Sequence, residues 1–223
     1  MGTISGSTLR VELIPDCIEG SQDTFLPASR EVHVVTKAAQ TSCPKNPEIL
    51  HYGTGTSELG IVLVASALKG VVAILIGGDL AEVVRDLEGH FPNSKLVSNQ
   101  PGQEPLVREV MSYIRVPRKN LDLKLDLRGT AFQKKVWRAV QRIPIGETTT
   151  YTALAALIGH PKAFRAVGNA CTVNPYAFAV PCHRVLHTNP ALSFGHNRGN
   201  DRMRPMVARE QKTVSESTQR EWQ

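Results

Sequence analysis

A cysteine, a histidine and an arginine stand side by side at Cys182, His183 and Arg184, within an otherwise apolar run over residues 179–185. Such polar and reactive side chains are costly to bury without a function. Cysteine is a strong nucleophile only as the thiolate, and a free cysteine has a pKa of about 8.5. A neighbouring histidine can act as its base, directly or through water. The run predicts a strand that carries a cysteine nucleophile, although an inert thiol beside a surface histidine and arginine is commoner for an isolated pair.

Two short helices are expected ahead of this run. Thr150 can cap a helix over residues 151–158, and a turn at residues 159–161 leads into a second helix over residues 162–171. Two helices joined by a short turn that contains glycine are typical of a helix-turn-helix, which binds DNA. A plain helical hairpin has the same pattern and is commoner where nothing else points to DNA, so both interpretations stay open here.

The second of these helices has an unusual predicted surface. Small side chains share one face, and larger ones share another: Ala163, Ala166 and Ala170 on the first, Phe164, Val167 and Cys171 on the second. The small face lies beside Lys162 and Arg165, so it could approach a charged groove closely. Packing of the same face against another helix is an equally good explanation.

The charge of the chain is uneven. The whole sequence has a formal net charge of +6. Residues 1–127 carry 12 basic and 15 acidic side chains, whereas residues 128–223 carry 14 basic and 5 acidic ones. A basic half indicates that the C-terminal part meets a polyanion. An accidental bias of a solvated surface is the alternative.

The elements that must position these residues follow from periodicity. Two β-branched apolar runs, residues 61–68 and 71–76, predict a β-hairpin. Two helices are expected next, one capped by Asp79 and one that begins near Pro105 after a loop. Their predicted buried positions are Leu80, Val83, Val84, Leu87 and Phe91 in the first and Leu106, Val110 and Met111 in the second.

A further strand and helix are expected between this part and the helix pair. Residues 121–127 alternate apolar and charged side chains, as a half-buried strand does. Thr130 and Gln133 then form a capping-box pair at the start of the clearest helix in the sequence. Its predicted apolar stripe is Phe132, Val136, Trp137 and Val140. Ahead of all these elements, only residues 31–36 have the pattern of a strand.

Composition excludes several classes of protein. A hydrophobic fraction of 41% and a charged fraction of 21% argue against wholesale disorder. No apolar run is long enough for a membrane span, and the N-terminus has no pattern of a secretory signal. The four cysteines form no C-x-x-C pair, which argues against a disulfide framework and against structural zinc. We therefore expect an intracellular protein without a bound metal.

Several stretches of the C-terminal half together resemble the O6-alkylguanine-DNA alkyltransferases. They are residues 128–133, 143–148, 150–155 and 165–168, the pair Asn174-Pro175, and above all residues 180–185, VPCHRV, which look like the active-site signature of that family. The spacing between the stretches also fits. Weaker similarity reaches back to about residue 51 and leaves out residues 1–50. The resemblance is closest to the bacterial Ada and Ogt type, without the cysteine-rich zinc sensor domain of Ada.

The resemblance implies a DNA repair protein that acts once. A helix-turn-helix binds the minor groove, the damaged guanine is flipped out, and a cysteine takes the alkyl group from O6. The implied partner is double-stranded DNA that carries O6-alkylguanine, with O4-alkylthymine as a further target. No cofactor and no metal are implied. We expect a monomer that works in the cytoplasm of a bacterium or in the nucleus of a eukaryote.

The family's site residues carry over by position. The implied catalytic residues are Cys182 as the nucleophile, His183 as its base through a water, Asn174 and Glu210 as their partners, and Tyr151 as the proton donor to the departing guanine. Arg165 is the implied finger that fills the hole left by the flipped base. The other implied DNA contacts are Tyr151, Gln133, Thr152, His160 and Ala166.

One loop departs from the family's pattern. Relatives often carry a Gly-Tyr-Arg-Trp-Gly type of loop beside the guanine pocket, where residues 193–199 read SFGHNRG. His196, followed by Asn197, stands where tyrosine is usual, and Met203 stands where lysine is common. The shape of the pocket and the range of alkyl groups are therefore open.

Two other functions compete with alkyl transfer. A Cys-His thiol hydrolase would use the same pair for acyl transfer, with many turnovers and no need for a helix-turn-helix. A damage-binding or regulatory helix-turn-helix protein would grip alkylated DNA without repairing it. Relatives of that kind lack the nucleophile, so the intact Cys182 weighs against this interpretation.

The expected fold class is α+β. Residues 1–50 are an extension of uncertain order, and residues 51–120 form an N-terminal α+β domain, ribonuclease H-like by the resemblance. Residues 121–210 form the mainly helical alkyltransferase domain with the helix-turn-helix and Cys182. Residues 211–223 are a polar tail that we expect to fray.

Overall fold

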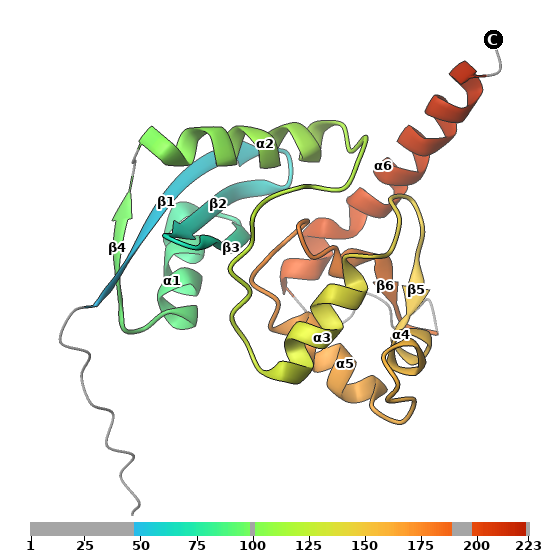
Figure 1. Ribbon diagram of the computed structural model, residues 1–223. Helices are drawn as coiled ribbons and strands as arrows, with labels where there is room; N and C mark the ends of the chain where they lie inside the picture. The colour runs from blue at the N-terminus through green and yellow to red at the C-terminus, as the bar shows by residue number, and fades with distance from the viewer. Residues whose placement is uncertain (1–46, 99–100, 189–197, 222–223) are drawn as a thin grey trace, which may run out of the picture. The chain divides into compact units, whose positions relative to one another are not determined.

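The computed structural model describes residues 47–98, 101–188 and 198–221, all within the unit Cys43–Gln223 (Figure 1). The fold is α+β, as expected: a four-stranded sheet with two helices comes first, and a mainly helical part follows. The strand expected at residues 31–36 lies outside the described residues. None of the described helices is both long and apolar enough to cross a membrane.

The sheet consists of β1 (Glu48–Ser57), β2 (Gly60–Ala67), β3 (Gly70–Gly77) and β4 (Ser94–Ser98), in the order β3-β2-β1-β4. β2 is antiparallel to both β1 and β3, and β4 is parallel to β1. The predicted hairpin is confirmed as β2 and β3. Gly70 adopts a φ of 142° at its turn, a conformation that glycine accepts without strain.

The sequence pattern predicts neither β1 nor β4. β1 begins at Glu48, so the expected extension over residues 1–50 is wrong at its end, where Leu50 is fully buried. The apolar pattern of β1 is interrupted by Gly53 and Gly55. A Cβ atom on Gly53 would lie 2.8 Å from the Cβ of Gln103, so glycine here allows the following helical segment to pack close to the strand.

Helix α1 (Leu80–His90) confirms the prediction of a capped amphipathic helix. The Asp79 side chain accepts a hydrogen bond from the backbone N–H of Glu82. Val83 and Leu87 are buried against one face of the sheet, together with Leu63 of β2. Leu80, at the first turn, is half exposed, so the buried stripe is narrower than predicted.

Helix α2 (Glu104–Arg115) follows a short 3₁₀ turn at Pro101–Gln103 and covers the other face of the sheet. It begins next to Pro105, as expected. Its buried positions are Val107, Val110, Tyr113 and Ile114, whereas Leu106 and Met111 are only partly buried. The stripe is shifted because α2 packs against C-terminal side chains such as Phe178 and Met206 as well as against the sheet.

Residues 121–127 do not form the predicted strand. Their side chains still alternate between partly buried and exposed positions: Leu121, Leu123 and Leu125 pack against the core, and the residues between them are more exposed. Only one bridge forms, in which Val71 of β3 donates to Lys124 O and accepts from Asp126 N, both at 2.8 Å. A ladder cannot extend because the next stretch of this edge of β3 bridges to Tyr176.

The C-terminal helices support the predicted helix-turn-helix. Helix α3 (Ala131–Val140) begins with the predicted capping box of Thr130 and Gln133. Helices α4 (Tyr151–Leu157) and α5 (Phe164–Thr172) pack on each other, and Thr150 caps α4 as expected. The indole N–H of Trp137 donates to the carbonyl oxygen of Ala170 at 2.9 Å, which joins α3 to α5.

Two further elements hold the cysteine segment. Strand β5 (Thr149–Thr150) pairs in parallel with β6 (Val185–Leu186), which links the start of α4 to the residues after Cys182. Helix α6 (Arg198–Glu221) buries Met203, Met206 and Glu210. The polar segment over residues 211–223, which we expected to fray, continues α6 as far as Glu221 (Figure 1).

Candidate active site

Cys182, His183 and Arg184 lie on a 3₁₀ turn (Cys182–Arg184), not on the predicted apolar strand. The backbone folds into successive turns here: Cys182 N donates to Val180 O, and Arg184 N donates to Pro181 O. All three side chains are buried, so the alternative of a surface histidine and arginine is wrong. A turn can direct three adjacent side chains to different partners within the interior, which an alternating strand cannot do.

Asn174 fixes the Cys182 thiol. Its Nδ2 atom donates to Cys182 Sγ at 3.2 Å and to Val180 O at 2.9 Å, while its Oδ1 atom accepts from Tyr176 N at 3.0 Å. A hydrogen bond with Cys171 and burial raise the pKa of Cys182 well above its ordinary value, and the hydrogen bond from Asn174 lowers it only in part. The resting cysteine is therefore a thiol that needs a base before it can attack carbon.

His183 is the basic group on this turn. Its Nε2 atom lies 2.8 Å from Oε1 of Glu210, and both side chains are buried. Burial lowers the pKa of His183, so the imidazole is neutral near pH 7. A neutral ring that donates Nε2–H to the carboxylate carries its lone pair on Nδ1. This buried Nδ1 has no hydrogen-bond partner within the described part of the chain, so it is available to take a proton.

Glu210 is the acceptor on which this network converges. Tyr113 donates its hydroxyl to Oε1 at 2.6 Å, Arg184 Nε donates to Oε2 at 2.8 Å, and Gly146 N donates to Oε2 at 3.2 Å. Burial alone would raise the pKa of Glu210, but the hydrogen bonds from His183 and Arg184 outweigh it and lower the pKa to about 2. The carboxylate is ionised, and it holds His183 in one orientation.

Arg184 and Tyr113 are two members of the network that the sequence reasoning does not assign. Arg184 Nη1 donates to Ile143 O at 2.6 Å and to Asn120 Oδ1 at 2.8 Å, and its Nη2 donates to the Tyr113 hydroxyl at 3.1 Å. Arg184 is within the VPCHRV motif, which is a signal that could have found it. Tyr113 has no such signal, because only the fold brings α2 to this site.

Tyr151 lies at the first position of α4 and packs against the core cluster that contains Cys182. Burial raises the pKa of Tyr151 to about 12, and the neighbouring Cys171 and Cys182 contribute to this shift. The phenol is protonated near neutral pH and can donate a proton. The structure therefore brings together all five residues predicted as catalytic: Cys182, His183, Asn174, Glu210 and Tyr151.

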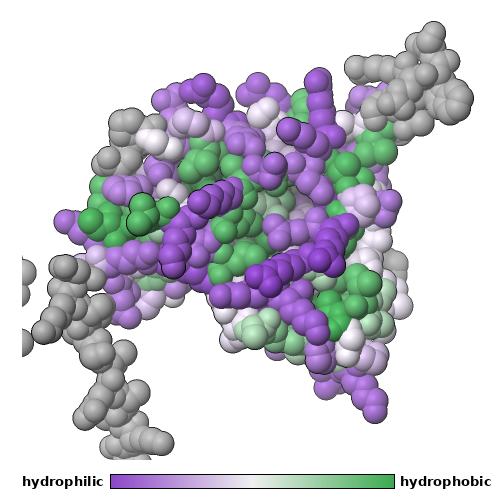
Figure 2. All heavy atoms as spheres, in the orientation of Figure 1, coloured by the Kyte–Doolittle hydropathy of each residue, from purple (hydrophilic) through white to green (hydrophobic). Residues whose placement is uncertain are grey.

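The residues predicted to touch DNA lie on α3, α4, α5 and the turn between α4 and α5. Arg165, Ala166, Thr152 and His160 are exposed, and Gln133 is partly buried, with its side-chain oxygen accepting from Thr130 N. Their surroundings combine charge and apolar groups. Figure 2 shows hydrophobic side chains among hydrophilic ones over the lower right of this face, where Figure 1 places these helices.

The predicted small face of α5 is only partly present. Ala166 is exposed, but Ala170 is buried, in the helix turn whose carbonyl oxygen accepts the Trp137 hydrogen bond. The predicted larger face is also divided, because Val167 and Cys171 are buried while Phe164 is 43% exposed. The buried face of α5 therefore consists of Val167, Ala170 and Cys171, and Phe164, at the first position of the helix, stays exposed.

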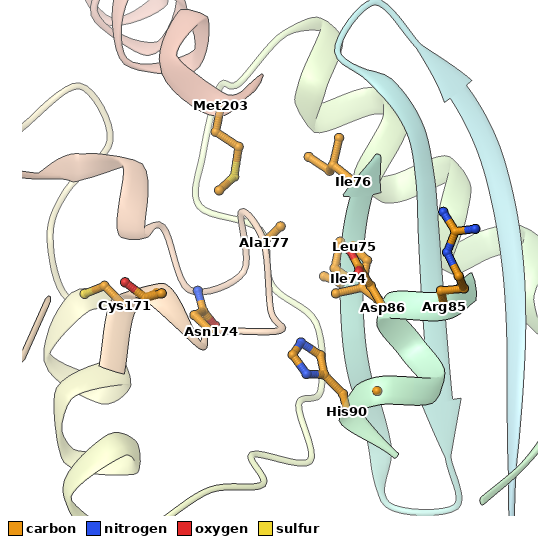
Figure 3. Close-up of a pocket in the computed structure, with 12 residues that line it drawn as sticks. Ile74, Leu75, Ile76, Arg85, Asp86, His90, Cys171, Asn174, Ala177 and Met203 are labelled. Carbon is orange, nitrogen blue, oxygen red and sulfur yellow. The ribbon is translucent and has the colours of Figure 1, made fainter. Parts of the chain in front are cut away.

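A cavity of about 370 Å³ separates α1 and β3 from the segment after α5. It is lined by His90 and Ile74 on one side and by Cys171 and Asn174 on the other (Figure 3). The sulfur of Cys171 points away from His90 in this view. Cys182, His183, Glu210 and Tyr151 do not line the cavity, so it is not a space in front of the nucleophile.

Of the residues that depart from the family's pattern, the structure describes Met203 but not the loop before it. Residues 193–197, with His196 and Asn197, lie outside the described residues. Met203 is buried in the core and lines the cavity. No group of three or more histidine, cysteine, aspartate or glutamate side chains able to hold a metal is found among the described residues.

Comparisons with known proteins place this arrangement in a family. Residues 131–212 match the DNA-binding domain of 6-O-methylguanine DNA methyltransferase. The chain is 42% identical over 164 residues to the bifunctional transcriptional activator/DNA repair enzyme Ada of Escherichia coli. That match covers 72% of this chain and 45% of Ada, so the chain spans less than half the length of that relative.

Two shorter proteins match over most of their length. The methylated-DNA–protein-cysteine methyltransferase of Methanosarcina acetivorans is 39% identical over 154 residues, which cover 68% of this chain and 92% of that protein. A crystal structure of Mycobacterium tuberculosis OGT in complex with DNA is 32% identical, with a TM-score of 0.61 over 73% of this chain and 94% of that one. This chain therefore belongs to the methylated-DNA–protein-cysteine methyltransferase family.

Proposed function

We propose that this protein repairs DNA by moving an alkyl group from O6 of guanine to Sγ of Cys182, once per molecule. The observation that carries the proposal is the buried pair of Cys182, held by Asn174, and His183, held by Glu210 with Nδ1 unoccupied. The relative from Methanosarcina acetivorans is named for this transfer, and it matches this chain over 92% of its own length.

Bond changes in the reaction balance without a further reactant. His183 Nδ1 takes the thiol proton of Cys182 through a water, and the thiolate attacks the alkyl carbon. The S–C bond forms as the C–O6 bond breaks, and the electron pair goes to the guanine. Tyr151 gives its hydroxyl proton to the departing base, and the proton on His183 restores the phenol.

The Glu210 network supports the transient charge on His183. The ionised carboxylate faces Nε2, so it stabilises the imidazolium that forms when the thiol proton arrives. Arg184 and Tyr113 hold the carboxylate in place from two further directions. Glu210, Arg184 and Tyr113 are therefore positioning residues, and Cys182, His183 and Tyr151 act on the reacting atoms.

The helix pair and its basic surroundings supply binding to DNA. Phosphate contacts give affinity without selection, and selection comes from the damaged base in the site. We assign Gln133, Thr152 and His160 to the DNA backbone, Ala166 to the groove, and Arg165 to the gap left by the flipped base. Flipping costs a few kcal/mol, least at a damaged pair. The solved complex of the Mycobacterium tuberculosis relative with DNA supports a duplex partner.

The proposal also covers a second target, the oligomeric state, the place of action and the domains. O4-alkylthymine is a second target, and the protein acts as a monomer without a cofactor. It works where the DNA is, in the cytoplasm of a bacterium or in the nucleus of a eukaryote. The N-terminal domain predicted for residues 51–120 also includes the start of β1, from Glu48, and residues 121–210 form the transferase domain.

Mass spectrometry after incubation with a duplex that contains O6-methylguanine tests the proposal. Transfer of a methyl group adds about 14 Da to the peptide with Cys182, because the methyl group replaces the thiol hydrogen and the net gain is CH2. The matched control is Cys171→Ala, which should accept the same adduct. Tight binding without an adduct would favour the damage-binding protein. Neither binding nor adduct would favour the thiol hydrolase, which a turnover assay with thioesters would then detect.

A further inference from the structure

Phe164 is an unusual residue for its place in the fold. It is the first residue of α5, and it is 43% exposed, although phenylalanine is among the residues most often buried. Its neighbours Ala163 and Ala166 are small. Helical periodicity predicts it on the buried face with Val167, but the structure leaves the ring at the surface of the helix pair.

The ring of Phe164 lies under the side chain of Arg165. Arg165 Cζ is 5.8 Å from the centre of the ring, within the range of a cation–π contact. Residues that are adjacent in a helix normally point in different directions, so this contact requires the arginine side chain to fold back over the ring. Among the described residues, Arg165 has no ion-pair partner, and the contact with the ring restricts the positions that its side chain can take.

We infer that Phe164 is a positioning residue that presents Arg165 to the duplex, an inference that rests on the proposed function. A long, exposed arginine samples many rotamers and must lose that freedom to enter a base stack. The ring reduces this loss before DNA binds. Proteins that bind the minor groove often insert apolar side chains such as phenylalanine between base steps. The ring of Phe164 can therefore pack against the bases beside the arginine when the groove opens.

Two other roles for the exposed ring are distinguishable from positioning. A ring that only adds affinity changes the DNA concentration at half-saturation and leaves the maximal rate unchanged. A ring that only stabilises α5 changes the reaction with every substrate. Positioning of Arg165 instead lowers the maximal rate with duplex DNA and leaves the free base O6-benzylguanine unaffected, because a free base needs no flipping.

The experiment measures single-turnover transfer to Cys182 with saturating duplex DNA and with O6-benzylguanine. Phe164→Ala should lower the maximal rate with duplex roughly two- to five-fold, the size of one exposed cation–π contact, and Phe164→Tyr should restore it. Leu157→Ala is the matched control, since Leu157 is a 72% exposed apolar residue on the same helix pair. In an Arg165→Ala background, Phe164→Ala should have no further effect.

Each of these results would overturn the inference: equal losses from Phe164→Ala with and without Arg165, a loss with the free base, or a tyrosine variant as slow as the alanine variant. If the unmodified chain transfers an alkyl group and Phe164→Ala changes nothing, this inference fails alone. If the unmodified chain alkylates Cys182 with neither substrate, the proposed function fails and the inference with it.

Discussion

His183 Nε2 lies 2.8 Å from Glu210 Oε1, and this buried contact decides which nitrogen of the imidazole can act as a base. The carboxylate holds the proton on Nε2, so the lone pair is on Nδ1. The same carboxylate receives hydrogen bonds from α2 and from the catalytic turn, through Tyr113 and Arg184. Helix α2 therefore supports His183, the base of the proposed reaction, through Glu210, although it contributes no reacting group.

Tyr113→Phe should test that connection. Removal of the hydroxyl leaves Glu210 Oε1 with one donor fewer, and a hydrogen bond to a charged group contributes roughly 1.5–3 kcal/mol. We expect a loss of that size in the free energy of unfolding, measured by urea denaturation, and slower transfer to Cys182. Tyr52→Phe is the control for loss of a hydroxyl in this domain. A change within about 0.5 kcal/mol, typical of surface sites, would contradict the role.

The dependence of stability on pH should show two windows. Burial lowers the pKa of His183 from 6.5. Below about pH 6.5 the unfolded chain therefore binds a proton at this histidine that the folded chain does not bind, and the free energy of unfolding decreases as the pH drops. The pKa of Glu210 is about 2 instead of 4.5, so a further loss occurs as the pH falls from about 4.5 toward 2.

Chemical denaturation at a series of pH values between 7 and 3 measures both windows. Glu210→Gln should shrink the lower window, because the carboxylate at position 210 is then absent. It should also destabilise the protein at neutral pH, since Arg184 is then buried without its charged partner. A Glu210→Gln variant that keeps the full acid dependence below pH 4.5 would show that other carboxylates cause it.

The fold was predictable where local chemistry decides it. The capping box at Thr130 and the cap at Asp79 are set by nearby residues, so both helix starts are confirmed. The strand predicted over residues 121–127 was wrong because a strand needs a free edge to pair with, and the edge of β3 is shared with Tyr176. β1 was not predicted because Gly53 and Gly55 interrupt its apolar pattern, and these glycines are explained only by close packing against a helical segment that lies far away in the sequence.

The candidate site was likewise predictable only in part. The types of Cys182 and His183 predict nucleophilic chemistry, but the match of Asn174 and Glu210 to the site came from a resemblance, and the structure brings them to the pair. Tyr113 contributes through a contact across 97 positions of sequence, which no local pattern encodes. The exposure of Phe164 was not predicted either, because periodicity places it on one face with Val167 and Cys171, which are buried.

Cys182→Ala should abolish transfer and leave affinity for DNA nearly unchanged. In the proposed reaction the thiol performs the chemistry, whereas phosphate contacts provide most of the affinity. Mass spectrometry should find no adduct, and fluorescence anisotropy with a labelled duplex should give a dissociation constant close to that of the unmodified chain. Joint loss of binding and transfer would mean that Cys182 is needed for the fold.

Cys171→Ala should make Cys182 more reactive. The hydrogen bond with Cys171 is the largest cause of the raised pKa of Cys182, so its removal lowers that pKa. Each unit of lowering increases the thiolate fraction at neutral pH about tenfold. Alkylation by iodoacetamide, followed by mass spectrometry at the Cys182 peptide, measures the rate. An unchanged or slower rate would indicate that burial alone sets the pKa.

Arg165→Ala should slow the repair of duplex DNA and leave the reaction with free O6-benzylguanine nearly unchanged. If Arg165 fills the gap left by a flipped guanine, its loss makes the flipped state less stable by roughly 1–3 kcal/mol, or about tenfold in rate per 1.4 kcal/mol. The side chain also carries a charge that attracts phosphates, so weaker binding is the competing explanation. The two differ at saturation: an affinity defect disappears at high DNA concentration, whereas a flipping defect persists as a lower maximal rate. Lys162→Ala is the matched control, because it removes an exposed charge just ahead of α5 without touching the finger position. Equal losses with duplex and with the free base would show that Arg165 instead holds the site together.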